Sequence, residues 1–217
     1  MQEIPEAVSM SRLVDQHLVG KQIRDAIAGC SPHKFVWYSA DPATYGARMR
    51  GRTIVRGEAH GGYLCIVFDD GTELRLGEGC RTLLLKPERK EPEKHQLLVD
   101  FEDGDRLAVI VLGYGFVSLE ASTNKGNDYF AISKAKPSPL SNEFDSKYFD
   151  QLLAPLKSGP LSLKAALATE QRIPGFGNGV LQDVLFQARL HPRKKLAQMS
   201  HTEFERLFES LKTVLAE

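Results

Sequence analysis

The strongest constraint on the fold is a change of sequence pattern between the two halves of the chain. From Gln22 to about Leu119, short runs rich in β-branched and large apolar residues are separated by turn signals, including the Asp-Gly pairs of segments 69–72 and 102–105. No helical pattern alternates with these runs, which excludes a parallel sheet covered by helices. The runs predict an antiparallel sandwich or barrel with strands at 53–56, 63–68, 73–76, 82–85, 97–101, 107–112 and 116–119.

The core of this β-rich region can be predicted from the same runs. We expect the sheet to close on itself, with Cys65 as an unpaired thiol on a strand. The residues expected inside are large aliphatic side chains of three strands, namely Leu64, Ile66, Leu97, Val99, Leu107 and Val109.

Helical periodicity appears on both sides of the β-rich region. Residues 7–18 place apolar side chains near a 3.6-residue period, and Gly20 then suits a left-handed helix cap. The second half of the chain predicts four further helices, the last of them opened by a capping box of Ser200 and Glu203. These four helices are expected at 145–153, 162–168, 180–188 and 202–216.

A polar segment with two prolines separates the two patterns. Pro137 and Pro139 lack backbone donors and bias the preceding residues away from helix, so we expect an interdomain linker there. The predicted fold class is therefore α+β. A domain of residues 1–135 is expected to contain the N-terminal helix and the antiparallel β-strands, a linker covers 136–143, and a helical domain covers 144–217.

Composition limits the classes of partner. Lys and Arg together number 28, as do Asp and Glu, so the formal net charge is zero and any site for a polyanion must be a local patch. Cys30, Cys65 and Cys80 are too widely spaced for a disulfide framework or a zinc knuckle. No apolar run approaches the roughly 18 residues of a membrane span. The first residues also lack the basic charge of a signal peptide, so we expect a cytoplasmic protein without a membrane partner.

The segment from Gln171 to Leu181 is the most informative one for function. It contains a proline and three glycines between two helical patterns, which predicts a helix–turn–helix connection. We expect Asn178 to cap a helix that opens at the next residue, and the exposed amides around Gly175 and Gly177 to hold a phosphate. A cluster of basic residues follows at 189–195. The alternative is a tight interhelical turn beside a solvated basic loop.

Several motifs in order along the chain resemble the formamidopyrimidine-DNA glycosylase/endonuclease VIII family. They are Glu3-Ile4-Pro5-Glu6, Leu76-Gly77, Glu93-Lys94-His95, Ile173-Pro174-Gly175-Phe176-Gly177-Asn178 and Leu190-His191-Pro192. The resemblance spans nearly the whole chain. It implies an N-terminal helix on a β-sandwich, a helix–two-turn–helix domain, and double-stranded, damaged or abasic DNA as the partner of a monomer. It also implies a bifunctional DNA glycosylase and abasic-site lyase of base excision repair.

The resemblance assigns roles to individual residues. Glu3 matches the family's catalytic acid and Glu6 its second acid, although a glutamate at the start of a helix is also favoured by the helix dipole alone. Lys164 matches a lysine that contacts phosphate beside the glycine turn. Arg75 stands where the family often places a histidine on the DNA backbone. Tyr114 lies where a family loop fills the void in the duplex, with a sandwich-edge tyrosine as the alternative.

The chain also departs from the family pattern. Gln2 occupies the position of the proline whose amine attacks C1′ of the damaged nucleotide, so the free amine is expected on Met1, one residue further out. The family's phosphate-binding lysine aligns near Gly61-Gly62, where there is no cation, and Glu78 replaces an apolar residue of the void-filling wedge. The family's zinc finger is missing from the sequence given, so we expect no metal and no cofactor in it. Weak or altered activity follows from these departures.

Three functions remain open at this level. The first is a DNA N-glycosylase or abasic-site lyase acting through Met1, or through water activated by Glu3. The second is a catalytically impaired protein that binds damaged or bent DNA. The third is an RNA- or protein-binding helix–two-turn–helix module.

Overall fold

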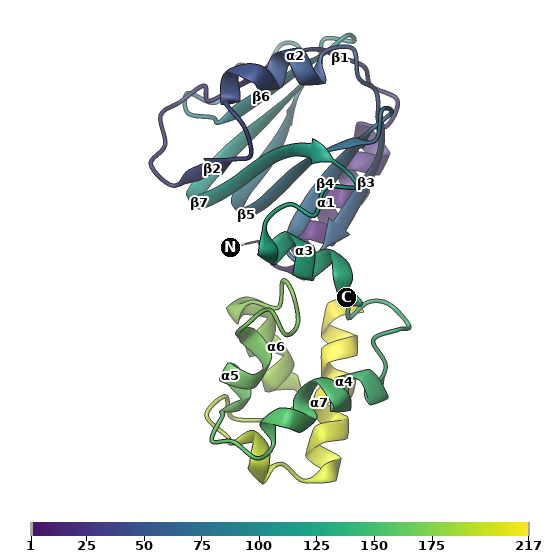
Figure 1. The fold of residues 1–217 in the computed structure, drawn as a ribbon, viewed down its shortest axis with the longest axis vertical. Coiled ribbons are helices and arrows are strands. Elements are labelled where there is room, and N and C mark those ends of the chain that lie inside the picture. The colour runs from purple at the N-terminus through teal and green to yellow at the C-terminus, as the bar shows by residue number, and fades with distance from the viewer. Residues whose placement is uncertain (1, 217) are drawn as a thin grey trace. The chain divides into compact units, whose positions relative to one another are not determined.

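The computed structural model describes residues 2–216, which form two compact units (Figure 1). The first unit contains residue 2 and residues 6–59 and 63–126. The second contains residues 127–216 together with two short segments from the N-terminal half, 3–5 and 60–62. Each unit is therefore built from pieces that are separate in the sequence.

Helix α1 (Ile4–His17) begins three residues earlier than the periodicity predicts. Of the predicted apolar stripe, Ala7 is buried, whereas Val8 and Met10 are half-buried. Val14 and, just beyond the helix, Leu18 join the core of the first unit. Gly20 has a φ of +84°, the left-handed conformation expected of a residue that ends a helix. Because glycine carries no Cβ, the chain can turn there into the first strand without strain.

The first unit is a sheet of seven strands. Six lie in the order β1-β6-β7-β5-β4-β3, and β2 adds to β7 in a parallel pair that the sequence did not indicate. An isolated antiparallel bridge between Gln22 and Thr53 joins the two outer ends of this order, so the sheet closes on itself as expected. The strands are β1 (Ile23–Ala28), β2 (Val36–Tyr38), β3 (Ile54–His60), β4 (Tyr63–Phe68), β5 (Thr72–Leu85), β6 (Leu97–Phe101) and β7 (Arg106–Ala121).

Two of these strands are longer than predicted. The runs 73–76 and 82–85 are parts of β5, and the runs 107–112 and 116–119 are parts of β7. The antiparallel register of the pair shifts between Glu78 and Cys80, where residues 112–114 of β7 bulge outward. A Cβ at Gly79 would lie 1.9 Å from the carbonyl oxygen of Leu112, so only glycine permits the two strands to approach so closely.

The predicted core is confirmed. All six aliphatic residues named from the strand pattern are buried in one cluster, and Cys65 is a buried free thiol on β4. A short helix that the sequence did not reveal, α2 (Tyr45–Met49), adds its two buried ends to this core. The hydroxyl of Tyr45 donates to the carbonyl of Val117 at 2.9 Å, so this buried hydroxyl group has a hydrogen-bond partner inside the first unit.

The second unit contains five α-helices and two short 3-10 helices within residues 127–216. The predicted helices appear within one or two residues at each end, whereas α3 was not expected. Side chains at Asn127, Asp145 and Ser162 cap α3, α4 and α5 by accepting hydrogen bonds from amides three residues on. The helices are α3 (Asp128–Ala135), α4 (Ser146–Leu153), α5 (Leu163–Ala168), α6 (Asn178–Gln187) and α7 (His201–Ala216).

The predicted capping box of α7 is confirmed. The amide of Ser200 donates to the Glu203 carboxylate at 2.9 Å, and the amide of Glu203 donates to the Ser200 hydroxyl at 3.3 Å. Segment 136–143, expected as the interdomain linker, connects α3 to α4 inside the second unit. Within residues 2–216, no helix is both long and apolar enough to cross a membrane.

Candidate functional site

The backbone of the glycine turn in the second unit packs directly against the backbone of Gly61 and Gly62, which belong to the same unit. Gly175 has a φ of +76°, and a Cβ there would lie 2.4 Å from the backbone of Gly61 and Gly62. A Cβ at Gly61, which has a φ of +58°, would in turn lie 2.9 Å from the Pro174 side chain. Glycines 61 and 175 are therefore required by close approach as well as by backbone conformation.

The N-terminus of α6 is capped by Glu3, and the prediction that Asn178 caps this helix is wrong. The helix begins at Asn178, its N-cap is Gly177, and no cap side chain bonds to the helix. The amides of Gly179 and Val180 donate instead to the two carboxylate oxygens of Glu3, at 2.9 and 2.7 Å. A carboxylate satisfies two helix amides at once and opposes the positive end of the dipole, which a neutral asparagine cannot match.

The absence of a side chain at Gly177 makes this arrangement possible. A Cβ at that position would lie 2.3 Å from Oε1 of Glu3. The amide of Ile4 also donates to the carbonyl of Gly175 at 3.0 Å, so the segment around Glu3 is held at the turn by its backbone as well. The first free amides of α6, those of Gly179 and Val180, thus bind a carboxylate of the same chain. Phosphate binding by the amides around Gly175 and Gly177 stays a prediction.

Asn178 and Lys164 nevertheless come together. Both are exposed, and both line one surface depression of about 460 Å³ in the second unit, beside the exposed ring of Phe186. The exposed basic residues Arg189 and Arg193 follow on the same stretch of chain. A cation and an amide at one depression form a site that can hold an anion without the helix amides.

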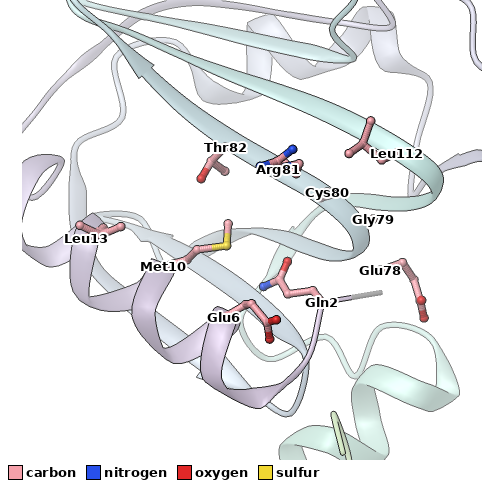
Figure 2. A pocket seen from close by; sticks show the side chains of 10 residues that line it. All are labelled: Gln2, Glu6, Met10, Leu13, Glu78, Gly79, Cys80, Arg81, Thr82 and Leu112. Carbon is pink, nitrogen blue, oxygen red and sulfur yellow. The ribbon is translucent and has the colours of Figure 1, made fainter. Parts of the chain in front are cut away.

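Gln2 and Glu6 line a cavity of about 360 Å³ in the first unit, between α1 and β5 (Figure 2). The backbone N–H of Gln2 donates to the carbonyl of Glu78 at 2.5 Å. Glu78 has a φ of +62°, an unusual conformation for a residue with a Cβ, at the point where β5 changes register. Met1, on which we expect the free amine, lies outside the described residues.

Another group on this cavity is the thiol of Cys80. Burial raises its pKa to about 11, against the weaker opposing effect of hydrogen bonds to the backbone. The group is therefore a protonated thiol at neutral pH, which is a poor nucleophile. It serves as an apolar wall of the cavity.

Arg75 does not reach the surface, and the expectation that it contacts DNA phosphate is wrong. Its side chain is completely buried and pairs with the equally buried carboxylate of Glu73 at 2.7 Å. It also donates to the carbonyls of Ala121 and Asn124, at 3.1 and 2.8 Å. Because Glu73 and Arg75 are two residues apart on β5, they face the same side of the strand. The arginine ties the end of β7 to β5.

Tyr114 is one of several exposed aromatic side chains at the bulge of β7. It is 67% exposed, and its ring lies 4.9 Å from that of Phe35, measured between centroids. Trp37 is also exposed and stacks on Phe116, with ring centroids 4.8 Å apart. The strand pattern did not predict this group, although segment 35–38 contains three aromatic residues. Insertion of Tyr114 into a duplex stays a prediction.

Two family models match the chain in succession. The formamidopyrimidine-DNA glycosylase N-terminal domain matches residues 1–110, and the helix–two-turn–helix domain of the same enzyme matches residues 136–217. The chain belongs to the formamidopyrimidine-DNA glycosylase family. This is a family of DNA-binding proteins of base excision repair, as the resemblance implied.

Relatives and solved structures agree with this assignment. The formamidopyrimidine-DNA glycosylase of Thermomicrobium roseum is 29% identical over the whole chain and 78% of its own length, and that of Geobacillus kaustophilus is 28% identical with the same coverage. The Lactococcus lactis enzyme bound non-covalently to DNA with an abasic site has a TM-score of 0.83 at 22% identity, covering 99% of this chain and 79% of that one. The Thermus thermophilus protein has a TM-score of 0.78 at 23% identity, covering 99% and 74%. These two structures support the α+β glycosylase fold.

The glycosylase-family residues are thus divided between the two units. The second unit brings together Glu3, the turn glycines, Asn178 and Lys164. The first carries Glu6, Tyr114 and the buried Arg75. Within the described residues, no cluster of three His, Cys, Asp or Glu side chains could hold a metal ion.

Proposed function

We propose that this glycosylase-family protein binds double-stranded DNA at damaged or abasic sites, one monomer to each lesion. The observation that carries the proposal is the depression where Lys164 and Asn178 are exposed together. A lysine and a carboxamide can both donate hydrogen bonds to a phosphate of the DNA backbone. Such phosphate contacts position a protein on DNA without reading the base sequence. The Lactococcus lactis relative has been solved with DNA containing an abasic site and with DNA containing FAPY-dG, which supports the same class of partner.

The binding proposal is tested by titrating duplexes with an abasic analogue against undamaged duplexes at several salt concentrations. Lys164→Ala should weaken binding and reduce the slope of log K against log salt by about 0.9, the value for one phosphate contact. Asn178→Ala should weaken binding to all duplexes alike. The matched control is Lys147→Ala, an exposed lysine on α4 outside the depression, which should leave the slope unchanged. Equal slopes for all three variants contradict the assigned phosphate contact.

We further propose that the protein cleaves abasic sites more readily than it releases damaged bases. Because a residue as large as glutamine at position 2 is expected to leave Met1 in place, the nitrogen of residue 2 is a peptide N–H, which donates to the Glu78 carbonyl and offers no amine for attack at C1′. The amine belongs to residue 1. An ordinary α-amino group has a pKa of about 7.7–8.0, so roughly one-tenth to one-sixth of it is neutral at pH 7.

A neutral primary amine can react with the ring-opened form of an abasic sugar. It adds to the C1′ aldehyde, water leaves, and an imine forms; loss of a proton from C2′ then expels the 3′ phosphate. Displacement of an intact base at C1′ demands more accurate placement, and a shift of about an ångström costs about 100-fold in rate. One additional residue at the N-terminus therefore penalises base release more than abasic-site cleavage.

Single-turnover incubation with borohydride trapping tests the chemistry. Duplexes with an abasic site should give a trapped adduct, whereas those with 8-oxoguanine or thymine glycol should give little or no base release. Glu3→Gln should retain DNA binding, since glutamine still offers an oxygen to one amide of α6. Efficient release of an oxidised base that is lost in Glu3→Gln contradicts the proposal and indicates a working glycosylase. Binding without any trapped adduct contradicts the lyase activity and indicates a DNA-binding protein without chemistry.

A further inference from the structure

A row of aromatic side chains crosses the sheet of the first unit and ends at Trp37. Trp37 on β2 lies opposite Phe116 on β7, and their rings stack with an interplanar angle of 5° and centroids 4.8 Å apart. Phe116 in turn meets Tyr63 of β4 edge to face, with centroids 5.5 Å apart. Gly77 of β5 leaves the space for this contact, since a Cβ there would lie 2.5 Å from the Tyr63 ring. The sheet therefore holds the row in a fixed order, with Trp37 at its outer end.

One face of the Trp37 ring is open. The centroid distance of 4.8 Å matches the spacing of neighbouring strands, so the two rings stand side by side on the sheet and the other face of Trp37 is turned away from β7. Within the described residues, β2 pairs only with β7, so no further strand covers that face (Figure 1). Phe116 is accordingly 5% exposed, whereas Trp37 is 51% exposed. A flat partner can stack on the open face.

Phe35 supplies a second exposed ring beside Trp37. The amide of Gly115 donates to the Phe35 carbonyl at 2.9 Å, which extends the pairing of β2 with β7 by one residue. Because Phe35 and Trp37 are two positions apart on extended chain, they share one face of the sheet. The Phe35 ring packs on Tyr114 and remains 46% exposed. We call Phe35 and Trp37 the aromatic platform; paired rings of this kind on a sheet suit successive bases of a single strand.

The charges near the aromatic platform suit a polyanion. Lys34 is exposed, and its ammonium lies 5.5 Å from the centre of the Phe35 ring. The segments 26–40 and 106–119, which include β2 and most of β7, contain no Asp or Glu. Glu78 belongs to β5, on the other side of β7 from β2. A cation beside exposed rings favours a phosphate backbone that carries bases.

We propose that the aromatic platform binds two unpaired bases of a single DNA strand, with Lys34 on the phosphate between them. Bases inside a duplex stack on one another and offer no free face, so the platform takes a strand only where it is unpaired. Stacking of this kind tolerates any base, because every base has a π-face. The inference goes beyond the proposed function, since it requires neither a lesion nor the depression at Lys164.

The first test uses the wild-type protein. The chain contains one tryptophan, so tryptophan fluorescence reports on the aromatic platform directly. An oligothymidylate of about eight nucleotides should quench this emission in a saturable way. The matched control ligand is an oligomer of the same length built from an abasic analogue, which has the phosphates but no bases; it should leave the emission unchanged and bind at least about fivefold more weakly. Equal affinity for the two oligomers, or no quenching by oligothymidylate, overturns the inference.

The second test removes one ring at a time. Trp37→Leu and Phe35→Leu should each weaken binding of a labelled oligothymidylate by about 5- to 150-fold, the range for one stacked base, whereas Trp37→Phe should retain most of the affinity. The matched control is Tyr129→Leu, which removes a ring of α3 that is 60% exposed and should leave the affinity unchanged. Thermal unfolding shows which variants remain folded. Wild-type affinity in a folded Trp37→Leu or Phe35→Leu variant overturns the inference.

The role of Lys34 is tested by salt dependence. Lys34→Ala should reduce the slope of log K against log salt for oligothymidylate by about 0.7, the value for one phosphate contact on a single strand. Lys147→Ala, an exposed lysine of the second unit, should leave this slope unchanged. Equal slopes for the two variants contradict the phosphate contact of Lys34.

A second copy of the chain is the competing occupant, because β2 is an edge strand. In that case the tryptophan emission changes with protein concentration in the absence of DNA and light scattering detects a dimer, a result that overturns the inference. The inference and the proposed function also fail separately. If oligothymidylate quenches the emission but abasic duplexes do not bind, the proposed function is wrong and the platform stands. If abasic duplexes bind but oligothymidylate does not quench, the proposed function stands and the platform is wrong.

Discussion

Replacing Glu3 by alanine should loosen the start of α6. The substitution leaves the amides of Gly179 and Val180 without the carboxylate that accepts from them at 2.9 and 2.7 Å. Loss of an N-cap acceptor costs about 1 kcal/mol, and loss of a negative charge at a helix N-terminus costs about 0.3–1 kcal/mol at a partly exposed position. We therefore expect a local destabilisation of about 1–2 kcal/mol.

Amide hydrogen exchange measured by NMR reports on this helix end directly. A loss of 1–2 kcal/mol corresponds to a fall of about 5- to 30-fold in the protection of Gly179 and Val180. Glu3→Gln removes the charge but retains an oxygen, so its effect should be about 0.3–1 kcal/mol. The control is Glu88→Ala, which removes an exposed carboxylate from a loop of the first unit and should leave protection at α6 unchanged.

Unchanged protection of both amides in Glu3→Ala would refute the capping role. The comparison also separates two functions of one side chain, since Glu3 is both the predicted catalytic acid and the cap of α6. If Glu3→Gln loses activity while α6 stays protected, the loss is chemical. If protection falls with activity in both variants, the structural role is sufficient to explain the loss.

Three further predictions follow from other parts of the structure. Arg75→Met should lower the free energy of unfolding by about 3–5 kcal/mol in urea titrations, because it removes the ion-pair partner of the buried Glu73 carboxylate. The double variant Glu73→Gln/Arg75→Met should recover part of this loss. An unchanged free energy of unfolding in Arg75→Met contradicts the role of the buried pair. The free energy of unfolding should fall as the pH rises from about 9 to about 11, because burial raises the pKa of the Cys80 thiol to about 11 and the folded state favours its protonated form. Urea titrations at a series of pH values measure this fall, which should be smaller in Cys80→Ala. Elemental analysis of residues 1–217 should find no stoichiometric zinc, since Cys30 follows β1, Cys65 lies on β4 and Cys80 on β5; one zinc per chain contradicts this.

The elements of the first unit that could be predicted are those with local signals. The two Asp-Gly pairs predict the positions of the hairpin turns, and Gly71 and Gly104 have the positive φ angles that such turns require. The full lengths of β5 and β7 could not be predicted, because Gly79 and the bulge at 112–114 look like breaks in the sequence. Only the pairing of β5 with β7 shows that Gly79 and the bulge are continuous parts of the two strands.

The two errors at the candidate site have different origins. Asn178 was predicted as a cap because local preference favours asparagine, but the acceptor comes from Glu3, which is 175 residues earlier in the chain. No local rule contains such a contact. The burial of Arg75, in contrast, had a visible signal, since Glu73 lies two residues before it on a predicted strand. An opposite charge on the same face was sufficient reason to expect an internal pair.

The discontinuity of the second unit limits how this protein can be divided. Its glycine turn packs against Gly61 and Gly62, and its helix α6 takes its cap from Glu3, so two pieces of the N-terminal half are structural parts of it. A gene fragment encoding only residues 127–217 would produce helices without either piece. A chimaera that takes its helical half from a relative therefore has to take residues 3–5 and 60–62 from the same relative. The smallest piece that can be exchanged consists of three separate segments of the sequence.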